Sequence, residues 1–146
     1  MNGTIRIRNV TTDDFIAIYL LNLYSLGYDY PTEQTKKRIA FILLNPNAKI
    51  LVAEIDGHVI GYIHAADYDC TYFDSLKCIL ALAVDESYRG QGIGRALIAA
   101  IEKWAANSGS MGVRLVTSTY RLEAHRFYEA CGYTFRKEQK NYIKVF

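Results

Sequence analysis

A glycine-rich turn between two apolar segments places the strongest constraint on the fold. The sequence reads ILALAV up to Val84, then DESYRGQGIG, and then a stretch in which apolar residues recur at helical spacing from Ile93 to Trp104. This pattern predicts a buried strand over residues 76–84, a turn, and an amphipathic helix that ends at NSGSMG. A further strand, VRLVTST, follows the helix. Two strands joined through a helix lie parallel with a right-handed connection, so a mixed sheet is expected.

The rest of the chain predicts more strands and helices around that unit. Alternation over Thr4–Arg8 predicts a strand, and TTDDF and Pro31 each open a helical pattern. KILVAEIDGHVIGYIHAAD predicts a hairpin about Asp56-Gly57, and ADYDCTYFDS after it predicts a loop. A short helix is expected over Leu122–Cys131, and two short strands in the tail YTFRKEQKNYIKVF. The predicted fold class is mixed α/β (α+β), with the element order βααβββαβαββ and about seven strands.

Composition limits the class of protein. The chain has 146 residues, with 17 lysines and arginines against 15 aspartates and glutamates, so its net charge is +2. A near-balanced charge argues against a nucleic-acid partner or a polybasic membrane anchor. No apolar run approaches the ~18 residues of a membrane span, and the sequence opens without a signal-peptide block. We expect one cytoplasmic domain over residues 1–146, either monomeric or homodimeric.

Cysteine and histidine give no sign of a metal site. The cysteines stand at positions 70, 78 and 131, and the histidines at 58, 64 and 125, without the spacing of metal-ligand pairs. We therefore expect no metal.

The glycine turn has two interpretations. A strand, a glycine turn and a helix N-terminus together form an anion site, to which Arg89 and Arg95 would add charge. A plain flexible turn has the same composition. The run is neither a P-loop, which needs GxxxxGK[ST], nor a GxGxxG dinucleotide fingerprint, because Leu97 stands where the third glycine belongs.

A wider set of motifs resembles a known family. RGQGIG follows the strand ILALAV, and EAHRFYEACGY comes about thirty residues later. Together these segments resemble the GNAT superfamily of acetyl-CoA-dependent N-acyltransferases, over nearly the whole chain from Ile5. The resemblance implies a central, mostly antiparallel, splayed sheet with helices on both faces. It also implies an N-acetyltransferase that moves the acetyl group of acetyl-CoA to a primary amine by direct attack in a ternary complex, releasing coenzyme A.

The resemblance assigns the donor site residue by residue. The glycine turn would bind the pyrophosphate through its backbone, and the end of the preceding strand would pair with the pantetheine arm. The residues concerned are Leu82, Ala83, Val84, Arg89, Gly90, Gln91, Gly92, Ile93, Gly94 and Arg95. Tyr128 matches the general acid, and a phenol suits protonation of a thiolate leaving group. The other interpretation of Tyr128 is a packed aromatic residue. Arg121 and His125 receive no role.

The residues that would bind the acceptor are assigned less completely than those of the donor site. No acidic residue lies in the 76–84 strand, so the general base stays unassigned. Two segments rich in acids and tyrosines would suit a cationic amine, such as a polyamine, an aminoglycoside or a protein amine. Their candidate residues are Tyr28, Tyr30, Asp67, Asp69, Tyr72 and Asp74. Ordinary polar loops have the same composition. The alternative function is a non-catalytic acyl-CoA-binding sensor of the same fold.

Overall fold

The computed structural model describes residues 3–146, which divide into two compact units after Leu115. The first unit holds a sheet of five strands in the order β1-β2-β3-β4-β5. The first three pairings are antiparallel, and β4 and β5 are parallel. The strands are β1 Arg6–Asn9, β2 Ala48–Ile55, β3 His58–Cys70, β4 Phe73–Val84 and β5 Gly112–Leu115. A mixed, mostly antiparallel sheet is confirmed, whereas the predicted number of about seven strands is wrong.

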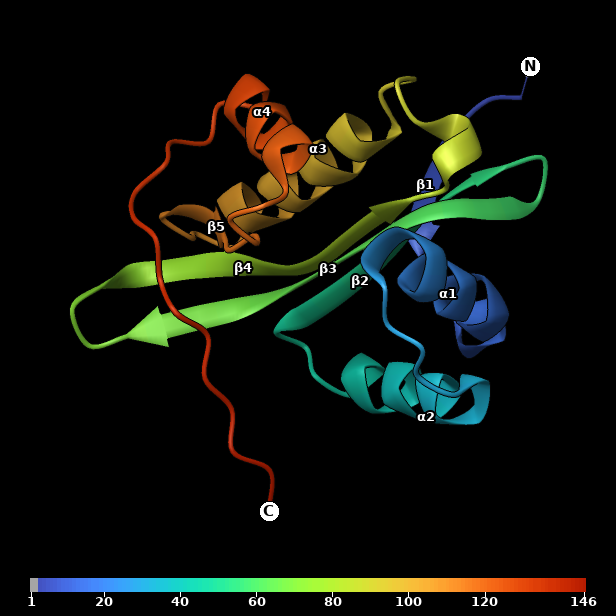
Figure 1. Cartoon of the computed structure of the whole chain (residues 1–146), viewed down its shortest axis with the longest axis horizontal. Coiled ribbons are helices and arrows are strands. Elements are labelled where there is room, and N and C mark those ends of the chain that lie inside the picture. The colour runs from blue at the N-terminus through green and yellow to red at the C-terminus, as the bar shows by residue number, and fades with distance from the viewer. Residues whose placement is uncertain (1–2) are drawn as a thin grey trace. The chain divides into compact units, whose positions relative to one another are not determined.

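Helices cover both faces of the sheet, as predicted (Figure 1). One face carries α1 Phe15–Leu21, which continues as the π-helical turn η2 Asn22–Leu26, and α2 Thr32–Leu43. The other face carries α3 Ile93–Asn107, the crossover between β4 and β5. Two short 3₁₀ turns, η1 Thr12–Asp14 and η3 Glu86–Tyr88, precede α1 and α3. The second unit contains α4 Leu122–Ala130.

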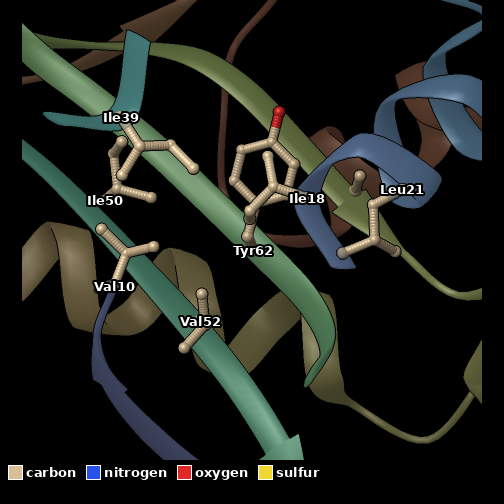
Figure 2. Close-up of a cluster of buried hydrophobic side chains, with 8 residues drawn as sticks. Val10, Ile18, Leu21, Ile39, Ile50, Val52 and Tyr62 are labelled. Carbon is tan, nitrogen blue, oxygen red and sulfur yellow. The ribbon is translucent and has the colours of Figure 1, made fainter. Parts of the chain in front are cut away.

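The core between the sheet and the α1–α2 pair is a cluster of buried side chains (Figure 2). Ile18 of α1 and Ile39 of α2 face Ile50 of β2 and Tyr62 of β3. The Tyr62 hydroxyl donates to Asn22 Oδ1 in η2, so its polar end is satisfied inside the cluster. Burial of each aliphatic side chain of this size contributes about 1.5–3 kcal/mol to the free energy of folding, so this cluster stabilises the packing of both helices on the sheet.

Two predicted turns have different outcomes. The Asp56-Gly57 hairpin is confirmed, with φ of 52° and 81° at the two turn residues, as a tight two-residue hairpin requires. The loop predicted over ADYDCTYFDS is wrong, because β3 continues to Cys70 and β4 already begins at Phe73. Tyr68 stacks on Phe73 with ring centroids 6.0 Å apart. Such cross-strand aromatic contacts stabilise pairing out to the tip.

The two strands predicted in the tail are also wrong. No helix or strand is assigned to residues 133–146, so the element order ends at α4. Ile143 and Val145 are 87% and 82% exposed. A strand needs a neighbour for its backbone hydrogen bonds, and none of the described strands pairs with this segment. The predicted strand VRLVTST is likewise shorter, because β5 ends at Leu115.

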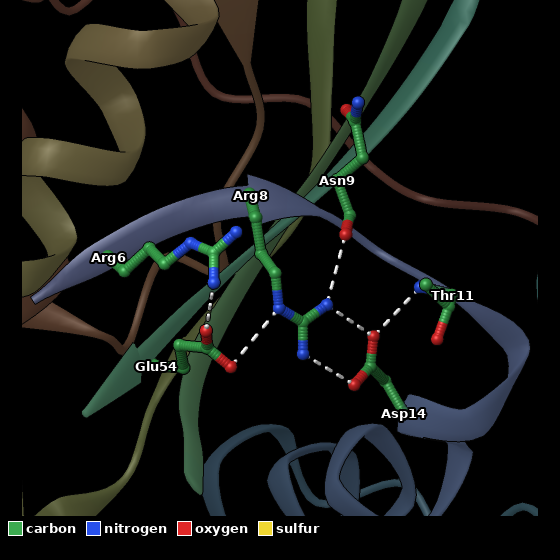
Figure 3. A network of polar contacts seen from close by, with 6 residues as sticks. All are labelled: Arg6, Arg8, Asn9, Thr11, Asp14 and Glu54. Carbon is green, nitrogen blue, oxygen red and sulfur yellow. Dashed lines mark hydrogen bonds and ion pairs between the residues drawn. The ribbon is translucent and has the colours of Figure 1, made fainter. Parts of the chain in front are cut away.

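An ion-pair network fixes where α1 begins (Figure 3). The Arg8 guanidinium on β1 donates to both carboxylate oxygens of Asp14 at 2.9 Å and to Glu54 Oε2 on β2 at 3.1 Å. The N–H of Thr11 donates to Asp14 Oδ2 at 2.8 Å, as in a capping box. Burial alone would raise the pKa of Asp14, but the bonds from Arg8 and Thr11 outweigh it and hold that pKa below its usual value.

Asp14→Asn should lower the free energy of unfolding at pH 7 by about 1–2 kcal/mol, since it removes a charged partner from a partly exposed guanidinium. Because the pKa of Asp14 is depressed in the folded state, its contribution is present above the unfolded pKa of about 3.9 and disappears as pH falls through the folded value. Urea unfolding at pH 7 and pH 3 measures both. The exposed neighbour provides the control, Asp13→Asn. Equal losses for the two variants at pH 7 would contradict this account.

Candidate active site

Strands β4 and β5 pair over only four positions. The register runs from Leu76 opposite Gly112 to Ile79 opposite Leu115. Beyond Ile79, β4 continues to Val84, and no strand within residues 3–146 pairs with this edge. On the other side of β4, Ala65 pairs with Ile79 and His64 with Ala81, so Leu80 is an extra residue in a β-bulge. The bulge therefore coincides with the point where the parallel pairing stops.

The open edge of β4 presents backbone groups. The N–H of Asp85 donates to Ile60 O at 2.8 Å, so Asp85 faces β3. Successive residues of a strand direct their N–H and C=O groups to alternate sides, which turns Leu82 and Val84 toward the open edge. Val84 O already accepts bonds from Ser25 Oγ at 3.1 Å and from Arg89 Nε at 3.3 Å. The backbone of Leu82 is therefore the more available of the two.

The glycine turn leads directly from this edge into α3. Gly90 and Gly92 have φ of 77° and 83°, a conformation that residues with a Cβ rarely adopt. A Cβ built at either glycine would meet nothing within 4 Å, so the surface above the turn is open. The first helical bond runs from Ala96 N–H to Gly92 O at 3.0 Å. The N–H groups of Ile93 and Gly94 lie before it, at the positive end of the helix dipole.

A glycine in β3 lets α3 approach the sheet at this point. Ile93 and Leu97 are 1% and 0% exposed and pack over Gly61. A Cβ at Gly61 would lie 3.1 Å from Ala83 O and 3.5 Å from Ile93 Cγ2 and Leu97 Cδ1. Gly61 was not among the residues predicted for the site, although a glycine inside a strand pattern signals a close backbone approach. Ser25, which fixes the end of β4, carried no such signal.

Tyr128 lies on α4 in the second unit. Its ring is partly buried and makes edge-to-face contacts with Phe127 at 5.3 Å and Tyr133 at 6.1 Å between centroids. Burial raises the pKa of the Tyr128 phenol from its ordinary value of 10.0, and Cys131 adds to the rise while Arg121 opposes it. The phenol therefore stays protonated at neutral pH and can donate a proton. His125 has its ring nitrogen Nε2 2.9 Å from Ser118 O.

The six residues predicted to bind the acceptor do not lie together in the structure. Asp67 forms an ion pair with Lys77, whose Nζ also lies 4.4 Å from the centre of the Trp104 ring. Asp69, Tyr72 and Asp74 lie at or beside the β3–β4 turn. Val84 lies eleven residue steps along β4 from Phe73, or about 36 Å at the usual rise per residue. These side chains therefore lie at the opposite end of β4 from the glycine turn.

The two predicted tyrosines of the α1–α2 connection are nearer to the glycine turn along the fold. Tyr28 and Tyr30 are 66% and 44% exposed and follow η2, which contains Ser25 and so touches Val84. Asp29 between them accepts a hydrogen bond from the Tyr19 hydroxyl at 2.9 Å. Of the six residues predicted to bind the acceptor, only these two come from a segment next to the C-terminal end of β4.

Comparison with known proteins gives the family. Residues 7–133 match the acetyltransferase (GNAT) family. The chain belongs to this family. It is 31% identical over 128 residues to an aminoalkylphosphonate N-acetyltransferase of Salmonella typhimurium, and the aligned region covers 87% of this chain and 83% of that protein. It is 32% identical over 140 residues to an uncharacterised N-acetyltransferase of Methanocaldococcus jannaschii, and the aligned region covers 94% of this chain and 83% of the relative.

Solved structures have the same fold. The chain resembles the aminoglycoside N-acetyltransferase AAC(6')-Iy in complex with CoA, with a TM-score of 0.86 and 20% identity, covering 99% of this chain and 97% of that one. A second AAC(6')-Iy structure, in complex with the bisubstrate analogue CoA-S-monomethyl-acetylneamine, has a TM-score of 0.85 at 22% identity, covering 99% of this chain and all of that one. The predicted GNAT membership and the prediction of an N-acetyltransferase enzyme are confirmed.

Between Gly3 and Phe146, no three or more His, Cys, Asp or Glu side chains gather in a way that could hold a metal ion. No helix in that range has both the length and the apolar character needed to cross a membrane.

Gly61→Val should destabilise this GNAT protein by about 1–3 kcal/mol, because the added side chain has to displace Ile93, Leu97 or the β4 backbone. Urea unfolding measures the loss. Gly112→Val on β5 is the matched control, since a Cβ there meets only Leu76 Cδ2 at 3.5 Å. A loss at position 112 as large as at position 61 would show that α3 does not depend on the close approach.

Proposed function

We propose that this GNAT enzyme transfers the acetyl group of acetyl-CoA to a primary amine by direct attack within a ternary complex. The observation that carries the proposal is the continuity of the unpaired β4 edge with the glycine turn and the start of α3. An open strand edge suits an extended amide-containing arm, and a helix N-terminus suits a diphosphate. The family match runs through both compact units, which supports a single acetyltransferase domain over residues 1–146.

The residues present fit this donor. The N–H groups from Arg89 to Arg95 would hold the pyrophosphate, where Gly90 and Gly92 leave open space above the backbone. Leu82, Ala83 and Val84 would hold the pantetheine arm, with Leu82 offering both its N–H and its C=O. Bound acetyl-CoA supplies a thioester carbonyl for the amine and a thiolate leaving group. Two solved structures of the same fold contain CoA or a CoA analogue, which supports the choice of donor.

We propose Tyr128 as the general acid that protonates the departing thiolate. Its raised pKa keeps the phenol protonated over the whole physiological range, as a proton donor requires. Loss of this proton donor should make activity fall as pH rises through that pKa, above the ordinary value of 10.0. The motif match FYEACGY supports the assignment.

The acceptor is proposed as a small cationic amine of the polyamine or aminoglycoside type, or an amine on a protein. AAC(6')-Iy by name modifies an aminoglycoside, and the Salmonella relative by name modifies an aminoalkylphosphonate, so both names indicate an amine. Tyr28 and Tyr30 are the best candidates for contact with it. Asp67, Asp69, Tyr72 and Asp74 would require an acceptor that extends along β4 toward the hairpin tip.

Acetyl-CoA at a hundredfold excess over its Kd should raise the Tm by roughly 5–10 °C, which corresponds to about 2.7 kcal/mol of binding energy. ATP and NAD serve as controls and should leave the Tm unchanged. Thiol release over a panel of amines then tests transfer. A shift with acetyl-CoA but no turnover with any amine would favour an acyl-CoA-binding sensor, and a shift with ATP or NAD alone would contradict the proposed donor.

Tyr128→Phe should lower kcat by about 10²-fold or more, since it removes one proton donor and little else. The Tm shift with acetyl-CoA should persist. Tyr120→Phe is the matched control in the same unit, at a side chain that is 80% exposed. An unchanged kcat in the Tyr128 variant would leave that residue with a packing role alone.

A further inference from the structure

His64 lies beside the open edge of β4. It pairs with Ile50 of β2 on one side and with Ala81 of β4 on the other. Ile50 belongs to the core cluster under α1 and α2, and Ala81 packs against the same cluster. Directly paired residues point to the same face of a sheet, so the His64 side chain points to that face as well. Ala81 is flanked by Leu80 in the bulge and by Leu82 on the open edge.

The position of His64 is at the margin of the apolar cluster. The next row on the same face consists of Ala48, Ala66 and Cys78, which are small side chains. His64 is partly buried, yet neither ring nitrogen has a hydrogen-bond partner among residues 3–146. Within residues 3–146, Thr117 Oγ1 is the one side-chain N or O atom that is both fully enclosed and without a hydrogen-bond partner. The His64 nitrogens also have no partner, so they are not fully enclosed and must reach solvent. An imidazole in this position is available to a substrate or a water molecule.

The surroundings favour a neutral imidazole. Burial lowers the pKa of His64 from its ordinary value of 6.5. In register, the nearest titratable groups on this face are Tyr62 in the row on one side, whose pKa burial raises to about 12, and Cys78 in the row on the other, which accepts a bond from Arg114 Nη1 at 3.2 Å. Arg8, which is paired with Asp14 and Glu54, is in the row of Tyr62, and Tyr68 is one row beyond Cys78. The packed elements α1 and α2 contribute apolar side chains to the cluster. At pH 7 His64 therefore has a free lone pair, and among the described residues no carboxylate shares its row across β2, β3 and β4.

We infer that the His64 imidazole accepts the proton which the acceptor amine loses during acetyl transfer, through at most one water. The inference rests on the proposed function. One strand spacing, about 4.8 Å, separates the His64 backbone from β4, and the pantetheine arm proposed for the far edge of β4 would lie one further spacing away. The amine nitrogen forms a bond to the carbonyl carbon, the carbon–sulfur bond breaks, and the thiolate takes a proton from Tyr128. The amine proton passes to His64, and both residues re-equilibrate with solvent. Residues 76–84 contain no acid for this task.

His64→Gln keeps a polar side chain of similar size but removes the proton acceptor. With the best amine of the panel, kcat should fall about 10²-fold or more, while the Tm shift with acetyl-CoA stays the same. In the unmodified protein, kcat at saturating amine should decline as pH falls through a value below 6.5, because protonation consumes the lone pair. The variant should lose the inflection of this acid limb, and its kcat should instead rise steadily with pH. His58→Gln, an identical change at the exposed start of β3, should alter neither property.

A second variant separates proton acceptance from packing. Added imidazole should restore activity to His64→Ala in a saturable manner and should have no effect on the unmodified protein. A His64→Gln protein that keeps its kcat and its acid limb would overturn the inference and leave the proposed function intact. Loss of both activity and the acetyl-CoA shift, without rescue by imidazole, would assign His64 to packing and also overturn it. Failure of the unmodified protein to acetylate any amine is a separate result, which counts against the proposed function itself.

Discussion

The short pairing between β4 and β5 is the constraint on which the proposed site depends. The two parallel strands share a ladder only from Leu76 to Ile79, and the bulge at Leu80 marks its end. Beyond this point β4 remains bonded to β3 on one edge, while its other edge presents the backbone of Leu82. A sheet normally covers or blunts such an edge, because unpaired backbone groups invite another chain. Here the open edge leads straight to the glycine turn and the start of α3.

Several contacts hold this arrangement in place. Gly61 allows Ile93 and Leu97 to sit close to the sheet, which fixes the first turn of α3 next to the end of β4. On the opposite face, the Arg8–Asp14 pair fixes the start of α1, and η2 then brings Ser25 to Val84 O. The proposed binding surface is therefore made of backbone groups, which side chains elsewhere in the fold hold in position. This explains how an apolar segment such as ILALAV can form part of a polar site.

Local signals in the sequence were sufficient for the crossover and the first hairpin. Asp56-Gly57 is one of the few pairs that tolerate positive φ at both positions, and Gly90 and Gly92 have the same tolerance. The second hairpin lacks such a pair and turns at Thr71 and Tyr72, so its polar residues looked like a loop. The tail has a strand-like pattern, but a pattern cannot supply the neighbouring edge that a strand requires. The same limit applies to Asp67, whose partner Lys77 becomes adjacent only when β3 and β4 pair in register.

Residue-resolved amide hydrogen exchange, with and without saturating acetyl-CoA, tests most directly that the open β4 edge and the glycine turn together hold the donor. Donor binding at this site should slow exchange at Leu82 and from Gly90 to Gly94, because these N–H groups would gain partners, and should leave exchange at Asp69 and Tyr72 near the hairpin tip unchanged. Binding of acetyl-CoA with unchanged exchange at Leu82 and in the turn would contradict it.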